Sequence, residues 1–287
     1  MAALMRIALV TARKLPRPDH DLPILVEAFA ARGVQSDIVA WEDSTVQWSA
    51  FDAAIIRSTW NYLEHYEAFR AWMAATARAT TLVNPLAVLE WNLHKSYLME
   101  FARAGIAVVA TELVRAGEDA DWSALFARHG ELVVKPAISA GSFATIRVAR
   151  GDAATAIAHR SAHAQRDFLV QPLLQSVLKR GEANLVHFGG RFSHAVSKHA
   201  RWDGDDEQAR GSIEVSAEDK AFAQRVLNYV GCKGLAGCSE SLAYARVDVA
   251  HDEAGHPMLM ELELIEPSLF LTTSPANASM LVDAVIG

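Results

Sequence analysis

Short apolar runs alternate with amphipathic segments along the first ninety residues. The runs at 6–11 and 51–57 are typical of buried strands, and a further strand is expected at 36–40. Apolar positions recur with helical spacing at 22–32 and 64–78. Strands that alternate with helices in this way predict βαβ units and an α/β domain with a parallel sheet. No G-x-G-x-x-G follows the first strand, so a dinucleotide site lacks support.

The pattern changes after residue 90 to strands that pair with nearby strands. Gly189-Gly190 joins two apolar runs, which is a strong hairpin signal because the tight turn needs positive φ. We therefore predict an α+β arrangement of mainly antiparallel sheet. Helices are expected at 93–104, 152–164 and 217–229, and strands at 131–135, 144–148, 168–171, 183–188, 191–197, 242–250 and 257–264.

Composition narrows the class of protein. With 287 residues, 51% hydrophobic and 21% charged, the chain is expected to fold as subdomains that share a cleft. A net charge of -7 and the lack of a dense Lys/Arg stripe argue against nucleic acid, and no apolar run is long enough for a membrane span. Two cysteines, Cys232 and Cys238, fit a reducing cytoplasm and are expected to be buried or half-buried thiols.

The last predicted hairpin separates an apolar face from a charged face. A shift of one residue would bury one strand's charges, so the hydrophobic pattern fixes the register. The residues expected to face the core are Val247, Val249, Met258, Met260, Leu262 and Leu264. The residues expected to form one polar patch are Arg246, Asp248, Glu261 and Glu263.

Three carboxylates in one patch repel one another, and one arginine cannot balance them. A divalent cation would, and magnesium prefers hard oxygen ligands completed by water and phosphate. The alternative is a solvated acidic strand face. Calcium is disfavoured because no Asp-rich loop with the EF-hand spacing occurs.

Two lysines and a loop of small residues suggest a phosphate site. Lys135 ends a predicted strand before Pro136, and the loop Ser139-Ala-Gly-Ser142 follows. Small residues let backbone N–H groups approach phosphate oxygens, and a nearby lysine adds positive charge. An ordinary hairpin loop is the alternative. Lys95 is expected on a helix, where an isolated lysine is usually a surface residue.

The order of these motifs resembles the ATP-grasp superfamily over residues 85–270. The resemblance rests on four motifs in this order: a lysine on a helix, a strand ending in Lys-Pro, a strand ending in Gln-Pro, and Asp followed by Glu-x-Glu on a final hairpin. The stretches that look like the group containing the D-cycloserine synthetase, the O-ureido-D-serine cyclase, are 57–62, 91–95, 189–196 and 261–269.

The resemblance implies an ATP-grasp fold with an N-terminal Rossmann-like domain. The expected units are a substrate-side α/β domain at 1–90, a small lid subdomain at 91–175, and a C-terminal subdomain with the metal-binding hairpin at 176–287.

The resemblance also assigns roles to individual residues. The residues expected to bind ATP phosphates, adenine and ribose are Lys95, Lys135, Ser139, Gly141, Ser142, Gln171, Pro172, Leu173, Leu174 and Glu182. Asp248, Glu261 and Glu263 would hold two Mg²⁺ ions, with Glu263 in place of the commoner Asn. Arg246 would stabilise the transferred phosphoryl group, and Lys198 would face substrate or phosphate.

A second group of residues is expected to hold an amino-acid-like substrate. Arg57, Ser58 and Trp60 lie at the carboxyl end of a predicted strand, where open α/β sheets bind ligands. Arg57 would pair with a carboxylate, although an Arg-aromatic cap on the sheet is the alternative. Glu266 and Ser268, just beyond the metal strand, are further candidates.

The implied reaction is ATP-dependent formation of a carbon–nitrogen bond through an acyl phosphate. The specific hypothesis is closure of O-ureido-D-serine on its own carboxylate, with loss of carbon dioxide and ammonia. A ligase that joins two separate substrates is the first alternative, and a non-catalytic nucleotide-binding module is the second. The presence of both lysines and all three carboxylates argues against the module. A homo-oligomer is expected only because dimers are common.

Overall fold

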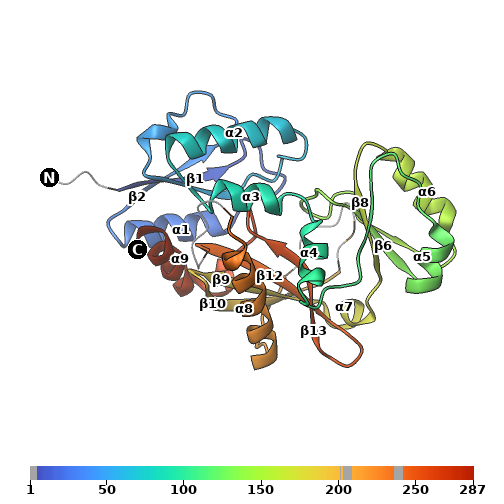
Figure 1. The fold of residues 1–287 in the computed structure, drawn as a ribbon. Coiled ribbons are helices and arrows are strands. Elements are labelled where there is room, and N and C mark those ends of the chain that lie inside the picture. Colours follow the sequence, from blue (N-terminus) through green and yellow to red (C-terminus); the bar gives the residue numbers. More distant parts are fainter. Residues whose placement is uncertain (1–4, 201, 203–208, 236–241) are drawn as a thin grey trace.

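The computed structural model describes residues 5–200, 202, 209–235 and 242–287, so the prediction for Cys238 lies outside the described residues. Within these residues the strands form three sheets. Figure 1 shows the first sheet at one end of the molecule, the third at the other end, and the second between them. The expected combination of a parallel sheet with antiparallel sheets is confirmed.

The first sheet is parallel and is covered on both faces, which explains why its two central strands are mainly apolar on both sides. Its strands have the order β2-β1-β3-β4. Helix α1 packs on one face and α2 on the other. The short strand β4 was not predicted. The elements are β1 (Arg6–Thr11), α1 (Asp21–Ala30), β2 (Gln35–Ala40), η1 (Trp48–Ala50), β3 (Ala53–Ser58), α2 (Tyr66–Ala79) and β4 (Thr81–Val83).

The third sheet is antiparallel, with the order β5-β8-β6-β7. Helices α5 and α6 cover one face through a shared apolar cluster, as Figure 1 shows. Sequence reasoning missed β5 and α5, which are too short to show a clear period. The elements are β5 (Glu112–Val114), α5 (Trp122–His129), β6 (Leu132–Pro136), β7 (Ile146–Val148), α6 (Ala153–Ala162) and β8 (Phe168–Pro172).

The central sheet is antiparallel, with the order β11-β10-β9-β12-β13. Gly189 and Gly190 have φ of 56° and 72°, which confirms the predicted tight hairpin. Helix α8 begins with a capping box between Ser216 and Asp219 and covers one face of this sheet. The elements are α7 (Gln175–Arg180), β9 (Glu182–Phe188), β10 (Arg191–Lys198), β11 (Ala209–Ser212), α8 (Ala217–Cys232), β12 (Tyr244–His251) and β13 (Pro257–Glu263).

The predicted helix at 93–104 is wrong at its start. Helix α3 (Leu86–Asn92) ends before residue 93, and helix α4 (Tyr97–Arg103) begins only at residue 97. Lys95 therefore lies in the turn between the two helices. The side chain of Asn92 bonds to the backbone of β13, and the Lys95 N–H donates to the Ala137 carbonyl at 2.8 Å. These long-range bonds draw the chain out of a continuous helix and turn Lys95 toward the third sheet.

The predicted alternation on the last strand holds at its end but fails at Met258 and Met260. Asp248 pairs with Glu261, whereas Val249 pairs with Leu259, so the strand contains one extra residue. This β-bulge shifts the period. Leu259, which is fully buried, enters the core in place of the two methionines, and Met260 lines a cavity instead.

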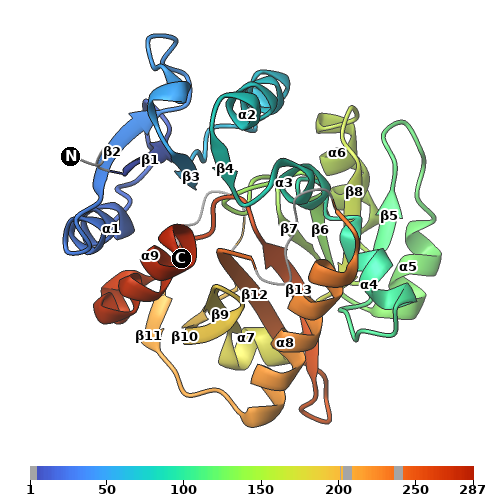
Figure 2. The same cartoon turned by 60° about the vertical axis from the view of Figure 1, so that its left-hand side comes forward.

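The C-terminal segment connects the first sheet to the central one. Helix α9 (Ala278–Ile286) lies beside α1, and both share an apolar cluster with strands of both sheets (Figure 2). Two short 3-10 helices precede it, η2 (Leu271–Thr273) and η3 (Pro275–Asn277). The carboxylate of Asp21 accepts the N–H groups of Leu269 and Leu271 at 2.8 and 2.7 Å.

The structure also bears on the expected burial of Cys232 and on the length of the helices. Cys232 is exposed at the end of α8, so its predicted burial is wrong, since it lies off the helix face that packs on the sheet through Phe222, Val226 and Val230. Among the residues described, no helix has the length and apolar character needed to cross a membrane.

Asn84 joins the first sheet to the central one. Its side-chain amide donates to the carbonyls of Tyr244 and Leu264 at 2.9 and 3.0 Å, and its side-chain oxygen accepts the Ala243 N–H at 3.0 Å. The side chain is buried. One residue therefore satisfies three backbone groups where the polypeptide passes between the sheets.

We predict that Asn84→Ala lowers the free energy of unfolding by about 3 kcal/mol, because it leaves buried backbone groups without partners. Urea denaturation followed by circular dichroism measures the change. Asn228→Ala, at an exposed position on α8, is the matched control and should have little effect. Equal stability of the two variants would contradict the role given to Asn84.

Candidate active site

A cavity of about 980 Å³ opens between the three sheets. It contains charged side chains of both signs from strands that are distant in the sequence. These side chains are Lys95, Lys135, Glu182, Lys198, Arg246, Glu261, Glu263 and Glu266. Lys95 lies in the turn before α4, and Lys135 lies in the third sheet. The other six side chains come from the central sheet or from the segment that follows it.

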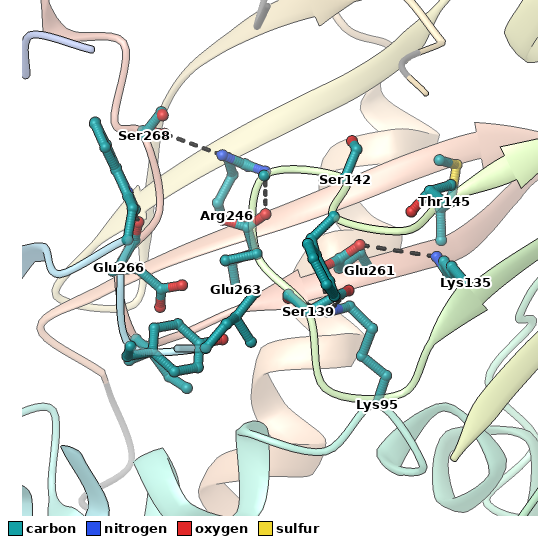
Figure 3. Close-up of a pocket in the computed structure, with 18 of the residues that line it drawn as sticks. Lys95, Lys135, Ser139, Ser142, Thr145, Arg246, Glu261, Glu263, Glu266 and Ser268 are labelled. Atoms are coloured by element: carbon teal, nitrogen blue, oxygen red, sulfur yellow. Dashed lines mark hydrogen bonds and ion pairs between the residues drawn. The ribbon is translucent and has the colours of Figure 1, made fainter. Parts of the chain in front are cut away.

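Glu261 lies between two lysines, as Figure 3 shows in part. Its carboxylate is 3.3 Å from the Lys95 ammonium and 3.8 Å from that of Lys135. Burial alone would raise the pKa of Glu261, but the two ammonium groups outweigh it and hold the pKa well below its usual range. Burial lowers the pKa of Lys135, and Glu261 opposes that effect. These charges therefore stabilise one another across the cavity.

Arg246 holds two carboxylates of the central sheet. Its guanidinium donates two hydrogen bonds of 2.8 Å to Asp248, and both residues are almost fully buried. It also contacts the carboxylate of Glu263. Burial raises the pKa of Glu263; Arg246 opposes this effect, while the nearby Asp248 adds to it. The predicted polar patch of four residues is thus present on one face of the sheet.

Lys198 reaches across strand β9. Its ammonium is 2.7 Å from Glu182 and 4.0 Å from Asp248. Lys198 was expected to face substrate or phosphate, and Glu182 was expected to bind the nucleotide. In this structure the two side chains contact each other.

The charge argument made from the sequence was incomplete. It set one arginine against three acids, whereas the structure brings Lys95, Lys135 and Lys198 to the same patch. In the described ranges no three His, Cys, Asp or Glu side chains are arranged to hold a metal ion. Because the three lysines offset the acids of the patch, charge balance alone does not require magnesium, and the assignment of Asp248, Glu261 and Glu263 as metal ligands stays a prediction.

The small-residue loop lies over the lysines. Lys95 donates to the carbonyl and the hydroxyl of Ser139 at 2.6 and 3.0 Å. Gly141, Ser142 and Ala144 have positive φ, which is unfavourable for the last two residues. Ser139, Gly141 and Ser142 line the cavity. Figure 3 shows the two serines there.

Part of the cavity lining is apolar. The predicted adenine segment contributes Gln171, Pro172, Leu173 and Leu174 to the lining. Val109, Val177 and Met260 also line the cavity, and Leu174 belongs to the same apolar cluster as these three. Sequence reasoning missed Met260, because it faces the cavity only through the β-bulge.

Arg57 and Ser58 are not at the cavity. Arg57 is fully buried, donates to the Pro267 carbonyl at 2.8 Å and lies 5.7 Å from the centre of the Tyr244 ring. The Ser58 hydroxyl bonds to that of Thr11 at 2.9 Å. This placement corrects their expected direct contact with substrate and supports the alternative of an Arg-aromatic cap.

The other predicted substrate residues do line the cavity. The Trp60 indole donates to the Glu266 carbonyl at 3.3 Å, and burial raises the pKa of the Glu266 carboxyl to about 7 although Lys95 opposes it. Arg17 lies 4.2 Å from the centre of the Trp60 ring and donates to the Ser268 hydroxyl at 3.4 Å. Arg17 was missed because nothing in its loop marks it in the sequence.

Comparison with known proteins identifies the family. The family described as D-cycloserine synthetase DcsG, N-terminal domain, matches residues 7–84. The cycloserine biosynthesis protein DcsG of Streptomyces lavendulae is 35% identical over 296 residues, which cover 97% of each chain. The chain belongs to the DcsG family.

Solved structures agree with the DcsG assignment. The crystal structure of D-cycloserine synthetase DcsG matches with a TM-score of 0.87 and 31% identity over 98% of each chain. The ATP-grasp ligase PsnB, solved with a precursor variant, Mg and ADP, has a TM-score of 0.63 and 18% identity over 98% of each chain, and shares the fold. The predicted ATP-grasp fold is confirmed, and the chain is an ATP-dependent carbon–nitrogen ligase.

The buried pair in this DcsG-family cavity gives a stability prediction. Arg246→Met leaves the Asp248 carboxylate buried without its main partner and should lower the free energy of unfolding by about 3 kcal/mol. Urea denaturation at neutral pH measures it. Adding Asp248→Asn removes the uncompensated charge, so the double variant should recover part of the loss. A double variant less stable than the single one would show that the pair does not act as described.

Proposed function

We propose that this chain closes O-ureido-D-serine to D-cycloserine with ATP and magnesium. The supporting observation is the set of lysines and carboxylates gathered under the small-residue loop, in a cavity whose lining is partly apolar. Its likeness to DcsG over nearly the whole chain favours this substrate over other amino acids.

The residues fit a magnesium nucleotide. Carboxylate oxygens are the ligands that magnesium prefers, and Glu261 and Glu263 face the cavity. The apolar side chains of Leu174 and Met260 in the cavity lining suit the face of a flat aromatic ring. The buried side-chain amide of Asn184, which pairs in register with Asp248, has no hydrogen-bond partner in the described structure. Its N–H and C=O groups could therefore bond to a ligand or to water at this site. Bound Mg·ATP would supply the phosphoryl group that activates the substrate carboxylate.

Nucleotide phosphates would exchange partners with the protein. Lys95 and Lys135 now contact Glu261 and would turn to the phosphate oxygens, which leaves the Glu261 carboxylate available to magnesium. Arg246 lies between Asp248 and Glu263 and would stabilise charge on the transferred group. Catalysis of phosphoryl transfer is mainly positioning and charge stabilisation of this kind.

The substrate would lie between Trp60, Glu266, Ser268 and Arg17. An ionised Glu266 would pair with the α-ammonium group, and a bound cation would favour that ionised form. Arg17, held over Trp60, would donate to the ureido carbonyl. Arg57 would act through the loop that it holds at Pro267.

Ring closure requires that water stay away from the acyl phosphate. The oxygen-linked ureido nitrogen attacks the acyl carbon and phosphate leaves. Hydrolysis of the remaining carbamoyl group then consumes one water and releases carbon dioxide and ammonia. The loop at 139–143 would cover the reacting groups. A cytoplasmic location and a homo-oligomer remain predictions.

Incubation with Mg²⁺, ATP and O-ureido-D-serine should release ADP and form D-cycloserine, measured by a coupled assay and by mass spectrometry. Omitting substrate or Mg²⁺ is the control. ADP formed only with an amino acid and a separate amine would show an intermolecular ligase instead. No ADP with any substrate would support a non-catalytic nucleotide-binding module.

Glu261→Gln should leave the fold intact and reduce ADP release at least about 100-fold, because a neutral amide is a poor magnesium ligand and leaves two lysines uncompensated. Circular dichroism checks the fold. Glu253→Gln, in the exposed turn of the same hairpin, is the matched control and should keep its activity. Activity of Glu261→Gln close to wild type would remove Glu261 from the metal site.

A further inference from the structure

Asn184 is a buried polar residue that the proposed reaction does not use. It lies in the middle of β9 and is fully buried. Neither the nitrogen nor the oxygen of its side-chain amide has a hydrogen-bond partner in the part of the chain that the structure describes. Buried polar groups are nearly always bonded, so both atoms of one amide without partners require an explanation.

The strand register places Asn184 at the floor of the charged cluster. It pairs with Asp248 of β12 on one side and with Val196 of β10 on the other. Residues directly opposite in an antiparallel sheet point to the same face. Asn184 therefore shares a face with Asp248 and with Glu182, two positions before it. Val196 offers it no polar partner.

Lys198 spans the strand at this level. It pairs in register with Glu182, whereas Asp248 pairs with Asn184. The Lys198 ammonium lies 2.7 Å from Glu182 and 4.0 Å from Asp248. It therefore crosses β9 diagonally, and its ammonium lies near the carboxylate of the residue that pairs with Asn184.

We propose that Asn184 positions Asp248 for magnesium when nucleotide phosphates draw Lys198 away. The amide N–H would then donate to the Asp248 carboxylate, and the amide oxygen would accept from water bound to the ion. Groups that orient metal ligands in this manner affect metal affinity without touching substrate. The inference rests on the proposed binding of a magnesium nucleotide and deepens it.

Asn184→Leu separates this role from a structural one. Leucine has a similar volume and no polar atoms, so the melting temperature of the ligand-free protein should stay the same or rise. The Mg²⁺ concentration that gives half of the ADP-induced rise in melting temperature should increase at least about tenfold. A lower melting temperature of the ligand-free protein with an unchanged Mg²⁺ requirement would overturn the proposal.

Smaller variants keep the test decisive if leucine does not fit. Asn184→Ser retains a hydroxyl group and should bind Mg²⁺ better than Asn184→Ala; equal requirements in the two would overturn the proposal. Leu185→Ala, on the opposite face of β9, controls for loosening of the strand and should lower stability without changing the Mg²⁺ requirement. If the wild-type protein shows no magnesium-dependent shift with ADP, the proposed function itself fails, and this inference with it.

Discussion

Compensation of buried charge is the constraint on which this cavity depends. Glu261 from the central sheet is stabilised by Lys95 from the α3–α4 turn and by Lys135 from the third sheet. Taking any of these groups out of water alone would be costly, so each segment brings its charge into the cavity beside a partner of opposite sign. Under the function proposed above, these groups would change partners when an anion enters. Binding of a triphosphate would then be an exchange of ion pairs and not the filling of an empty positive site.

Sequence pattern was sufficient for the part of the site in which local periodicity decides the geometry. The polar face of the last hairpin follows from alternation, and the structure pairs Asp248 with Glu261 as that alternation requires. The alternation gave the wrong face for Met260, since the β-bulge there depends on which segment of the chain pairs with the outer edge of the strand. Here the segment at 107–109 bonds to Leu259 from that edge. Such a contact between distant segments has no local signature.

The placement of two arginines near the substrate end of the cavity also depends on contacts between distant segments. Arg57 lies at the end of an apolar strand, which suggested a ligand site there. The loop that carries Pro267 packs over it and makes it a buried support. Arg17 lies in a loop without periodicity, and only the fold brings it to Trp60 and Ser268. Likewise, the position of Lys95 in a turn depends on its bond to Ala137, beyond the range of helix signals.

The proposed exchange of charge partners would also give a role to Glu263, where the resemblance to the ATP-grasp superfamily leads one to expect asparagine. Arg246 contacts both Glu263 and Asp248, so two carboxylates share one guanidinium. An asparagine at position 263 would leave Arg246 committed to Asp248 alone. With a second carboxylate beside it, Arg246 could, in the proposed reaction, turn toward a developing phosphate charge while one acid keeps it in place. A glutamate at position 263 would thus suit a site in which each cation needs a partner both before and after the nucleotide binds.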